Sequence, residues 1–286
     1  MANGYRKILV AYDGSKSARN ALTVASKLAT EGKSWIKVVA VVPPYIGDLE
    51  LVGVQNVKET MEGPGRKLLA EARRIADDQG VNILTNLEQG EPYECIVHVA
   101  EDENCDLIVM GRRGMRHLER ELMGGVTARV IGHTPKDVLV VPETAKLSWE
   151  NIILAYDGEP HTENALKKAL ALTKEHGSNL TAITVIYTND EIVALAHDMV
   201  ATQVKNAKGK LDNIATLAAD AGVTMQTVVK EGELHQEITS LAKEKKASLI
   251  VMSTHGRKEG LGRLLNMGSI TERSIGYAEC PVMIIH

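Results

Sequence analysis

Residues 106–131 read DLIVMGRRGMRHLERELMGGVTARVI, which is an apolar run, then a glycine-rich loop, then a segment that favours a helix. The apolar run, Leu107–Met110, is typical of a buried parallel strand. Glycines follow at positions 111, 114, 124 and 125, and the helix is predicted to start at Val126. Free N–H groups in a glycine-rich turn, together with the positive end of a helix dipole, favour an anion such as phosphate. A glycine-rich connection without a ligand is the alternative interpretation.

The same unit occurs twice in the chain. The segment Lys7–Gly14, KILVAYDG, recurs 144 positions later as Asn151–Gly158, NIILAYDG. The apolar run Leu107–Met110 recurs 142 positions later as Leu249–Met252. The chain is therefore two copies of one unit. The second copy is two residues shorter in one part and two residues longer in a later part.

Strands and helices alternate in each predicted domain, and we place the domains at 1–143 and 148–286. The predicted strands are 7–12, 36–42, 81–87, 107–110 and 138–141, and then 151–156, 180–186, 223–229, 249–252 and 282–285. Predicted helices of the first domain are 17–30, 64–79 and a third that starts near Pro92, with a looser stretch at 47–63. Apolar strands that alternate with helices indicate an α/β fold with a parallel sheet covered on both faces.

Composition and charge narrow the classes of partner. The net charge of −4 argues against nucleic-acid binding, and an aromatic content of 3% without Phe argues against base stacking. No apolar run reaches the roughly 18 residues that a membrane helix needs. We see no signal peptide and only scattered cysteines, so we predict a cytoplasmic protein. We find no metal-binding spacing among the histidines and no nucleophile–base pair, so we predict no catalytic residues.

The repeat and its loop resemble the universal stress protein family, in a tandem form with two domains. The spacing Gly111-x2-Gly114-x9-Gly124 is similar to that family's nucleotide loop, although Gly125 stands where the family usually has Ser or Thr. The resemblance implies two tandem open parallel five-stranded sheets, flavodoxin-like or adenine nucleotide alpha hydrolase-like, with strand order 3-2-1-4-5. It also implies a bound adenine nucleotide, which is ATP, AMP or ADP, with Mg²⁺ as a candidate companion ion.

The resemblance also implies roles within one site at the carboxyl ends of the strands. Asp13 would bind the ribose hydroxyls, because a carboxylate accepts hydroxyl protons but repels phosphate. A plain Asp-Gly-Ser turn is the alternative role for Asp13. The backbone of Val41 would meet adenine, and the loop glycines with Val126 would hold the phosphates. Thr127 would cap the helix and reach a phosphate, or would only cap the helix.

The predicted nucleotide-binding residues of the first domain are Asp13, Val41, Met110, Gly111, Gly114, Gly124, Gly125, Val126 and Thr127. Those of the second domain are Asp157, Val185, Met252, Gly256, Gly268, Ser269 and Ile270. Loop arginines that would screen phosphate charge or stay solvated are Arg112, Arg113 and Arg116. The second loop is two residues longer but keeps a hydroxyl, at Ser269. We expect the first domain to bind at least as well, because loop length and glycines with positive φ direct the phosphate-binding N–H groups.

The leading hypothesis is a stress-response regulator that binds nucleotide and acts on an unidentified protein partner through its conformation. The alternatives are a slow ATP hydrolase, which would need a bound metal and a positioned water, and a nucleotide-free scaffold. Apolar edge strands need cover, so we expect strands 138–141 and 282–285 to join the domains as an intrachain pseudo-dimer. A homodimer of the whole chain is compatible with this arrangement but is not required.

Overall fold

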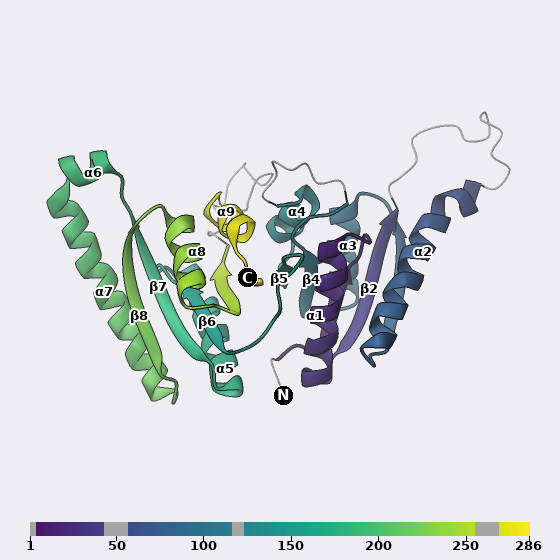
Figure 1. The fold of residues 1–286 in the computed structure, drawn as a ribbon, viewed down its shortest axis with the longest axis horizontal. Helices are drawn as coiled ribbons and strands as arrows, with labels where there is room; N and C mark the ends of the chain where they lie inside the picture. Colours follow the sequence, from purple (N-terminus) through teal and green to yellow (C-terminus); the bar gives the residue numbers. More distant parts are fainter. Residues whose placement is uncertain (1–3, 43–56, 116–122, 255–268) are drawn as a thin grey trace. The chain divides into compact units, whose positions relative to one another are not determined.

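The computed structural model describes residues 4–42, 57–115, 123–254 and 269–286. The chain divides into two compact units, 1–144 and 145–286. Within each unit the strands are parallel and the helices pack against the sheet (Figure 1). The prediction of an α/β fold with parallel sheets is confirmed.

The first unit alternates strands and helices from its first strand onward. In chain order they are β1 (Lys7–Ala11), α1 (Lys16–Gly32), β2 (Trp35–Val42), α2 (Val57–Asp78), β3 (Ile83–Gln89), α3 (Pro92–Asp102), β4 (Leu107–Gly111), α4 (Gly125–His133) and β5 (Asp137–Val141). The strand order is β3-β2-β1-β4-β5, and all four neighbouring pairs are parallel. Helices α1 and α2 pack together, as do α3 and α4, and right-handed crossovers put the two pairs on opposite faces.

The second unit repeats this plan with two short additions, η1 and α6. In chain order it contains β6 (Asn151–Ala155), η1 (Pro160–Thr162), α5 (Glu163–His176), β7 (Asn179–Tyr187), α6 (Asp190–Leu195), α7 (His197–Asp220), β8 (Met225–Gly232), α8 (Leu234–Glu244), β9 (Leu249–Ser253), α9 (Ser269–Tyr277) and β10 (Val282–Ile285). The strand order within this unit is β8-β7-β6-β9-β10. In both units, therefore, the first strand lies between the second and the fourth, as the order 3-2-1-4-5 requires.

Strands β1 and β4 lie side by side in the first sheet. Their register pairs Ile8 with Leu107 and Ala11 with Met110. Ile8 and Leu107 are fully buried, and burying one such side chain stabilises the fold by roughly 1.5–3 kcal/mol. Strands β6 and β9 are neighbours in the same way in the second unit. Each sheet thus carries two firmly packed strands whose carboxyl ends open at the same edge.

Helix α2 begins earlier than its sequence suggests. The prediction of a start at Pro64 and of a loose stretch before it is wrong for residues 57–63, because α2 starts at Val57 and contains Pro64. A Cβ at Gly65 would lie 2.4 Å from the side chain of Leu87, so the helix approaches the sheet closely at this turn. Pro64 therefore lies within α2 rather than in its first turn, which is the position that proline prefers. Gly80, with φ of +69°, follows the helix as predicted.

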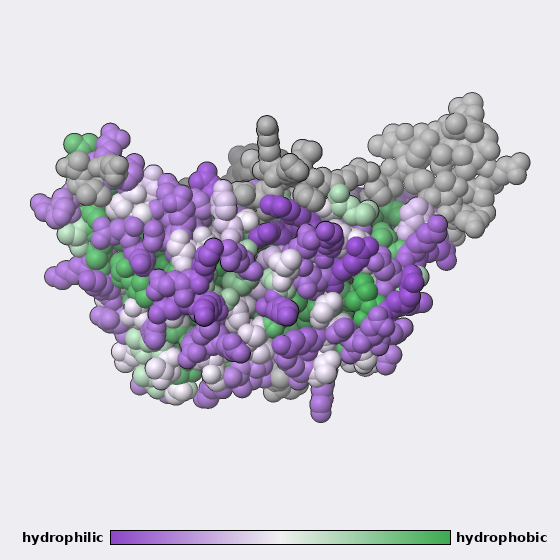
Figure 2. All heavy atoms as spheres, in the orientation of Figure 1, coloured by the Kyte–Doolittle hydropathy of each residue, from purple (hydrophilic) through white to green (hydrophobic). Residues whose placement is uncertain are grey.

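The face of the molecule that Figure 2 presents is largely hydrophilic. Figure 2 shows hydrophilic side chains over most of the face that it presents, with smaller apolar areas between them. Among the described residues, no helix is both long enough and apolar enough to cross a membrane.

Candidate functional site

Asp13 connects the turn after β1 to the loop after β4. Its Oδ1 atom accepts a hydrogen bond from the Ser15 N–H at 3.0 Å, which holds the side chain in its own turn. Its Oδ2 atom accepts a hydrogen bond from the Met115 N–H, also at 3.0 Å. The predicted carboxylate and the predicted glycine loop therefore meet directly, although they are about a hundred residues apart in the chain.

Two of the loop glycines lie so close to neighbouring atoms that a Cβ would overlap with them. A Cβ at Gly111 would lie 2.7 Å from backbone and side-chain atoms of Ser17 and from the Ala18 nitrogen. A Cβ at Gly114 would lie 2.7 Å from Asp13 Oδ2. At Gly124 the nearest atom would be 3.5 Å away, which is an ordinary contact. Glycine is thus sterically needed at position 111, which lies against the backbone of α1, whereas a side chain at position 114 would displace the Asp13 carboxylate.

The expectation of positive φ at the loop glycines is wrong for the described loop residues. The glycines at 111, 114, 124 and 125 have no left-handed backbone, whereas Gly14 has φ of +78° and Gly158 has φ of +77°. These two directly follow Asp13 and Asp157, so the left-handed glycine shapes the turn that carries the carboxylate. The loop uses glycine for close approach instead.

Two serines hold the loop against α1; a helix cap was predicted at Ser15 or Ser17, but their contact with the loop was not. The Ser15 hydroxyl donates to the carbonyl of Arg113 at 3.1 Å and also accepts from the Ala18 N–H, which makes Ser15 the N-cap of α1. The Ser17 hydroxyl donates to the same carbonyl and accepts from the Arg113 N–H at 3.3 Å. The signal in the sequence is Ser15 and Ser17, which follow Asp13-Gly14, but serines at these positions are equally typical of helix capping alone.

The helix after the loop begins with a glycine rather than a hydroxyl cap. Gly124 is the N-cap of α4, without a side-chain hydrogen bond, and its N–H donates to the Arg112 carbonyl at 2.9 Å. Thr127 is buried, and its hydroxyl donates to the carbonyl of Gly111 at 3.1 Å. Thr127 therefore braces the start of the loop rather than capping the helix, and a phosphate contact from it stays a prediction. A Cβ at Gly125 would meet no atom within 4 Å.

The remaining predicted residues of the first unit lie nearby in different settings. Met110 is buried in β4, whereas Val41 is half-buried near the end of β2. Val126 is half-buried in the first turn of α4. Their nucleotide contacts stay predictions, as does that of Arg116, which lies outside the described residues.

Two neighbouring arginines place positive charge in the loop. Burial of the Arg112 guanidinium, and then the positive charge of Arg113, lower the pKa of Arg112. The Nε–H of Arg113 is buried and finds no acceptor within the described part of the chain. Desolvated positive charge and an unmatched donor both favour a bound anion.

The second unit brings its predicted residues around a small cavity of about 60 Å³. Asp157, Val185, Met252 and Ile270 all line it, together with His161. Ligand pockets usually measure roughly 300–1,000 Å³, so this cavity has room for only part of a nucleotide. Ser269 begins α9, as Gly125 begins α4, while Gly256 and Gly268 lie outside the described residues.

Asp157 is held differently from Asp13. Its Oδ1 atom accepts from the Glu159 N–H at 2.9 Å and from the Thr162 hydroxyl at 3.1 Å. Its Oδ2 atom lies 3.2 Å from Nε2 of His161. The preceding residue, Tyr156, donates to Glu163, and burial followed by this hydrogen bond raises the pKa of Tyr156 to about 12.

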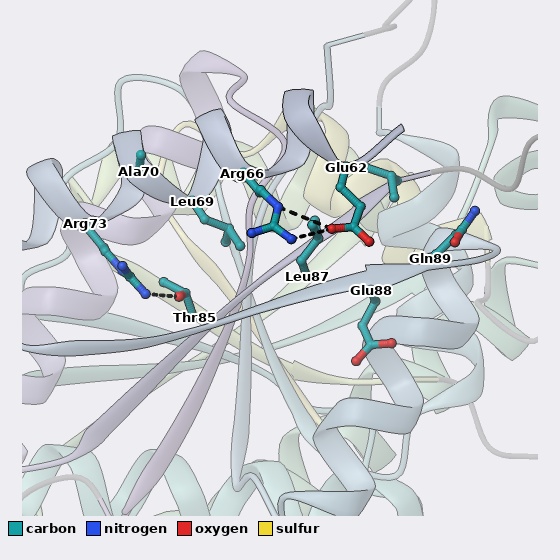
Figure 3. A pocket seen from close by; sticks show the side chains of 10 residues that line it. Glu62, Arg66, Leu69, Ala70, Arg73, Thr85, Leu87, Glu88 and Gln89 are labelled. Atoms are coloured by element: carbon teal, nitrogen blue, oxygen red, sulfur yellow. Dashed lines mark hydrogen bonds and ion pairs between the residues drawn. The ribbon is translucent and has the colours of Figure 1, made fainter. Parts of the chain in front are cut away.

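A larger groove of about 610 Å³ lies between α2 and β3, away from the carboxylate (Figure 3). Its arginines are engaged locally, since Arg66 pairs with Glu62 at 2.5 Å and Arg73 donates to Thr85 at 2.6 Å. This groove shares none of the predicted nucleotide-binding residues. Within the described ranges, no group of three or more His, Cys, Asp or Glu side chains could hold a metal ion.

Comparison with known proteins identifies the family of the chain. The model of the universal stress protein family matches residues 4–142 and again 148–286. A universal stress protein of Methanocaldococcus jannaschii is 34% identical over 146 residues, which cover 50% of this chain and 86% of that protein. A crystal structure of a universal stress protein from Archaeoglobus fulgidus covers 98% of this chain and 95% of its own, with a TM-score of 0.73 and 20% identity.

A further universal stress protein was solved in complex with cAMP, and it is 28% identical, covering 48% of this chain and 97% of its own with a TM-score of 0.39. The family match extends over nearly the whole chain in two consecutive copies. The chain therefore belongs to the universal stress protein family, as a member with two tandem family domains.

Proposed function

We propose that this chain binds an adenine nucleotide, which is ATP, ADP or AMP, at the carboxyl ends of β1 and β4 and at the corresponding place in the second unit. The observation that carries the proposal is the hydrogen bond from the Met115 N–H to Asp13. It puts an acceptor suited to sugar hydroxyls next to a loop whose N–H groups suit phosphate. Ribose and phosphate are adjacent groups in a nucleotide, just as the carboxylate and the loop are adjacent in this site.

The loop has the chemistry that a phosphate group requires. Gly111 and Gly114 bring the backbone close, and the space around Gly125 leaves the first turn of α4 open to an anion. Arg112 and the Nε–H of Arg113 supply positive charge. Mg²⁺, if it accompanies the nucleotide, would be held largely by phosphate oxygens and water, as this ion usually is.

Binding would change the contacts of the loop. A ribose hydroxyl that donates to Asp13 competes with the Met115 N–H for the same carboxylate. Once displaced, that N–H would be available to phosphate, so the loop would exchange one partner for another. Such an exchange gives a cytoplasmic protein partner a surface that differs with nucleotide state, which supports a regulatory role in the stress response.

Isothermal titration of the full chain with ATP and with AMP tests the proposal. Asp157→Ala serves as the background, because it weakens the second unit and leaves the first to be measured. Adding Asp13→Ala removes an acceptor of charge-assisted hydrogen bonds, at a cost of roughly 1.5–3 kcal/mol. We therefore expect the Kd of the first unit to rise about 10- to 150-fold.

Asp106→Ala is the matched control. Asp106 also accepts two backbone N–H groups, from Arg6 at 2.8 Å and Lys7 at 2.9 Å, but it precedes β4 and lies at the opposite end of the sheet. It should leave the Kd unchanged. Equal losses in the two variants would leave Asp13 as a turn residue, and a wild-type chain that binds neither ligand would be a nucleotide-free scaffold.

A further inference from the structure

Positions 17 and 161 correspond in the two units but carry different side chains. Each lies four residues after the site carboxylate, so Ser17 follows Asp13 as His161 follows Asp157. Ser17 is buried in the first turn of α1, whereas His161 lies in the short helix η1. The two side chains contact different parts of their sites.

In the first unit, Ser17 contacts the loop and leaves the carboxylate to backbone donors. Its hydroxyl donates to the Arg113 carbonyl and accepts from the Arg113 N–H at 3.3 Å. The described hydrogen bonds of the Asp13 carboxylate come from the N–H groups of Ser15 and Met115. Both donors are backbone amides, which carry no ionisable proton in the physiological pH range.

In the second unit, His161 contacts the carboxylate itself. Its Nε2 atom lies 3.2 Å from Oδ2 of Asp157, and both side chains are partly buried, with 23% and 38% exposed. The Glu159 N–H donates to Oδ1, and the Thr162 hydroxyl lies 3.1 Å from the same atom and 2.8 Å from the Glu159 carbonyl. A carboxylate offers about four lone-pair positions, so these three contacts leave little room for a sugar hydroxyl. Because His161 and Asp157 both line the cavity, a ribose that enters must share or displace His161.

Protonation of the imidazole changes the strength of this contact. Among the residues that the structure describes, the ionisable side chains beside this pair include Tyr156, Glu159, Glu163 and Lys210. Lys210, from α7, lies 3.0 Å from the backbone carbonyl of Asp157 and pairs with Glu159. Histidine is the side-chain type whose charge changes between about pH 5 and 8. A protonated imidazole at 3.2 Å from Oδ2 would form an ion pair with Asp157, whereas a neutral imidazole would form only a hydrogen bond to the carboxylate.

We propose that His161 holds Asp157 away from the ligand, so that the second unit binds ribose more weakly than the first, and most weakly at low pH. The inference rests on the proposed nucleotide function. Where the imidazole is neutral the ion pair is absent, and the carboxylate is more available to a sugar hydroxyl. The first unit has Ser17 at this position, so we expect no such dependence there.

Adenosine is the probe, because it carries ribose without a phosphate that a protonated imidazole would attract. Asp13→Ala isolates the second unit and Asp157→Ala isolates the first. The Kd for adenosine is measured by isothermal titration at about pH 5.5 and about pH 8. A partly exposed ion pair is a modest competitor, so we expect the second unit to bind about two- to five-fold more weakly at the lower pH and the first to stay constant.

Two substitutions then locate the effect. His161→Ser introduces the residue of the first unit, and His161→Gln keeps a neutral side chain with a hydrogen-bond donor. Both should remove the pH dependence, and His161→Ser should also tighten adenosine binding at the lower pH. His197→Gln is the matched control, because His197 has a highly exposed side chain on α7, and it should keep the wild-type pH response.

The outcomes separate this inference from the function on which it rests. If the second unit binds AMP and adenosine but His161→Ser and His161→Gln keep the pH dependence, His161 does not control the site. Tighter adenosine binding at the lower pH in the wild-type second unit would overturn the inference as well. If neither unit binds adenosine or AMP at either pH, the nucleotide function itself has failed.

Discussion

Replacing Gly111 with alanine tests whether the loop after β4 must lie directly against α1. The new Cβ would lie 2.7 Å from the Ala18 nitrogen and from the carbonyl carbon and hydroxyl of Ser17. Ordinary contact begins at 3.4 Å, so the loop and the helix must separate by about 0.7 Å, the difference between these two distances. Two of the three atoms belong to the backbone and cannot rotate away.

The cost follows from this overlap. Overpacking of a well-packed site costs about 1–3 kcal/mol. In a unit of this size, 1 kcal/mol corresponds to roughly 2–4 °C in melting temperature, so Gly111→Ala should lower the Tm of the first unit by about 2–12 °C. The same displacement stretches the hydrogen bonds between Ser17 and Arg113, so nucleotide affinity at the first unit should fall too.

Differential scanning calorimetry of the full chain measures the change, with Gly125→Ala as the matched control. A Cβ at Gly125 meets nothing within 4 Å. Because alanine favours a helix over glycine by up to about 1 kcal/mol, the control should melt at the wild-type temperature or slightly above it. If the two variants melt alike, the close approach of the loop to α1 is wrong.

Two further substitutions have expected outcomes. Gly125→Ser places a hydroxyl in open space at the start of α4. One added hydrogen bond to phosphate, of about 1 kcal/mol, should lower the Kd for ATP roughly fivefold in titrations of the first unit. An unchanged Kd would contradict a phosphate at this turn. Tyr156→Phe removes the hydrogen bond to Glu163 and should cost about 0.5–1.5 kcal/mol at neutral pH. Burial raises the pKa of Tyr156 from 10.0 to about 12, so the folded chain binds the phenol proton more tightly than the unfolded chain does. The resulting contribution to the free energy of unfolding is fully present below pH 10 and is lost as the pH rises toward 12. The free energy of unfolding, measured by urea denaturation below pH 10 and again as the pH approaches 12, should fall less with pH in Tyr156→Phe than in the wild type. An equal fall in both proteins would refute the assignment of this pH dependence to Tyr156.

The strands were predictable because a strand buried on both faces has a simple sequence signature. The apolar run that starts at Leu107 forms β4, and the repeated segment at Lys7 forms β1, as predicted. The start of α2 was not predictable in this way. Proline is usually a first-turn residue, so Pro64 favoured a later start. The close approach of Gly65 to Leu87 joins two positions that no local sequence pattern relates.

The site was predictable in its parts but not in its contacts. Asp13 and Gly114 were found from the repeat and from loop spacing, yet their direct approach depends on the register of β1 with β4. The roles of Ser17 and His161 were missed because each depends on what the side chain meets after folding. The signal that was available is the difference between the repeats, since a serine in one copy stands where a histidine stands in the other.

A crystal structure of the chain with AMP tests the central claim most directly. We predict that the ribose hydroxyls donate to the Asp13 carboxylate and that the phosphate contacts the loop N–H groups and the first turn of α4. The Met115 N–H should then no longer bond to Asp13. AMP bound elsewhere, for example in the groove between α2 and β3, with the hydrogen bond between Met115 and Asp13 intact, would contradict the account.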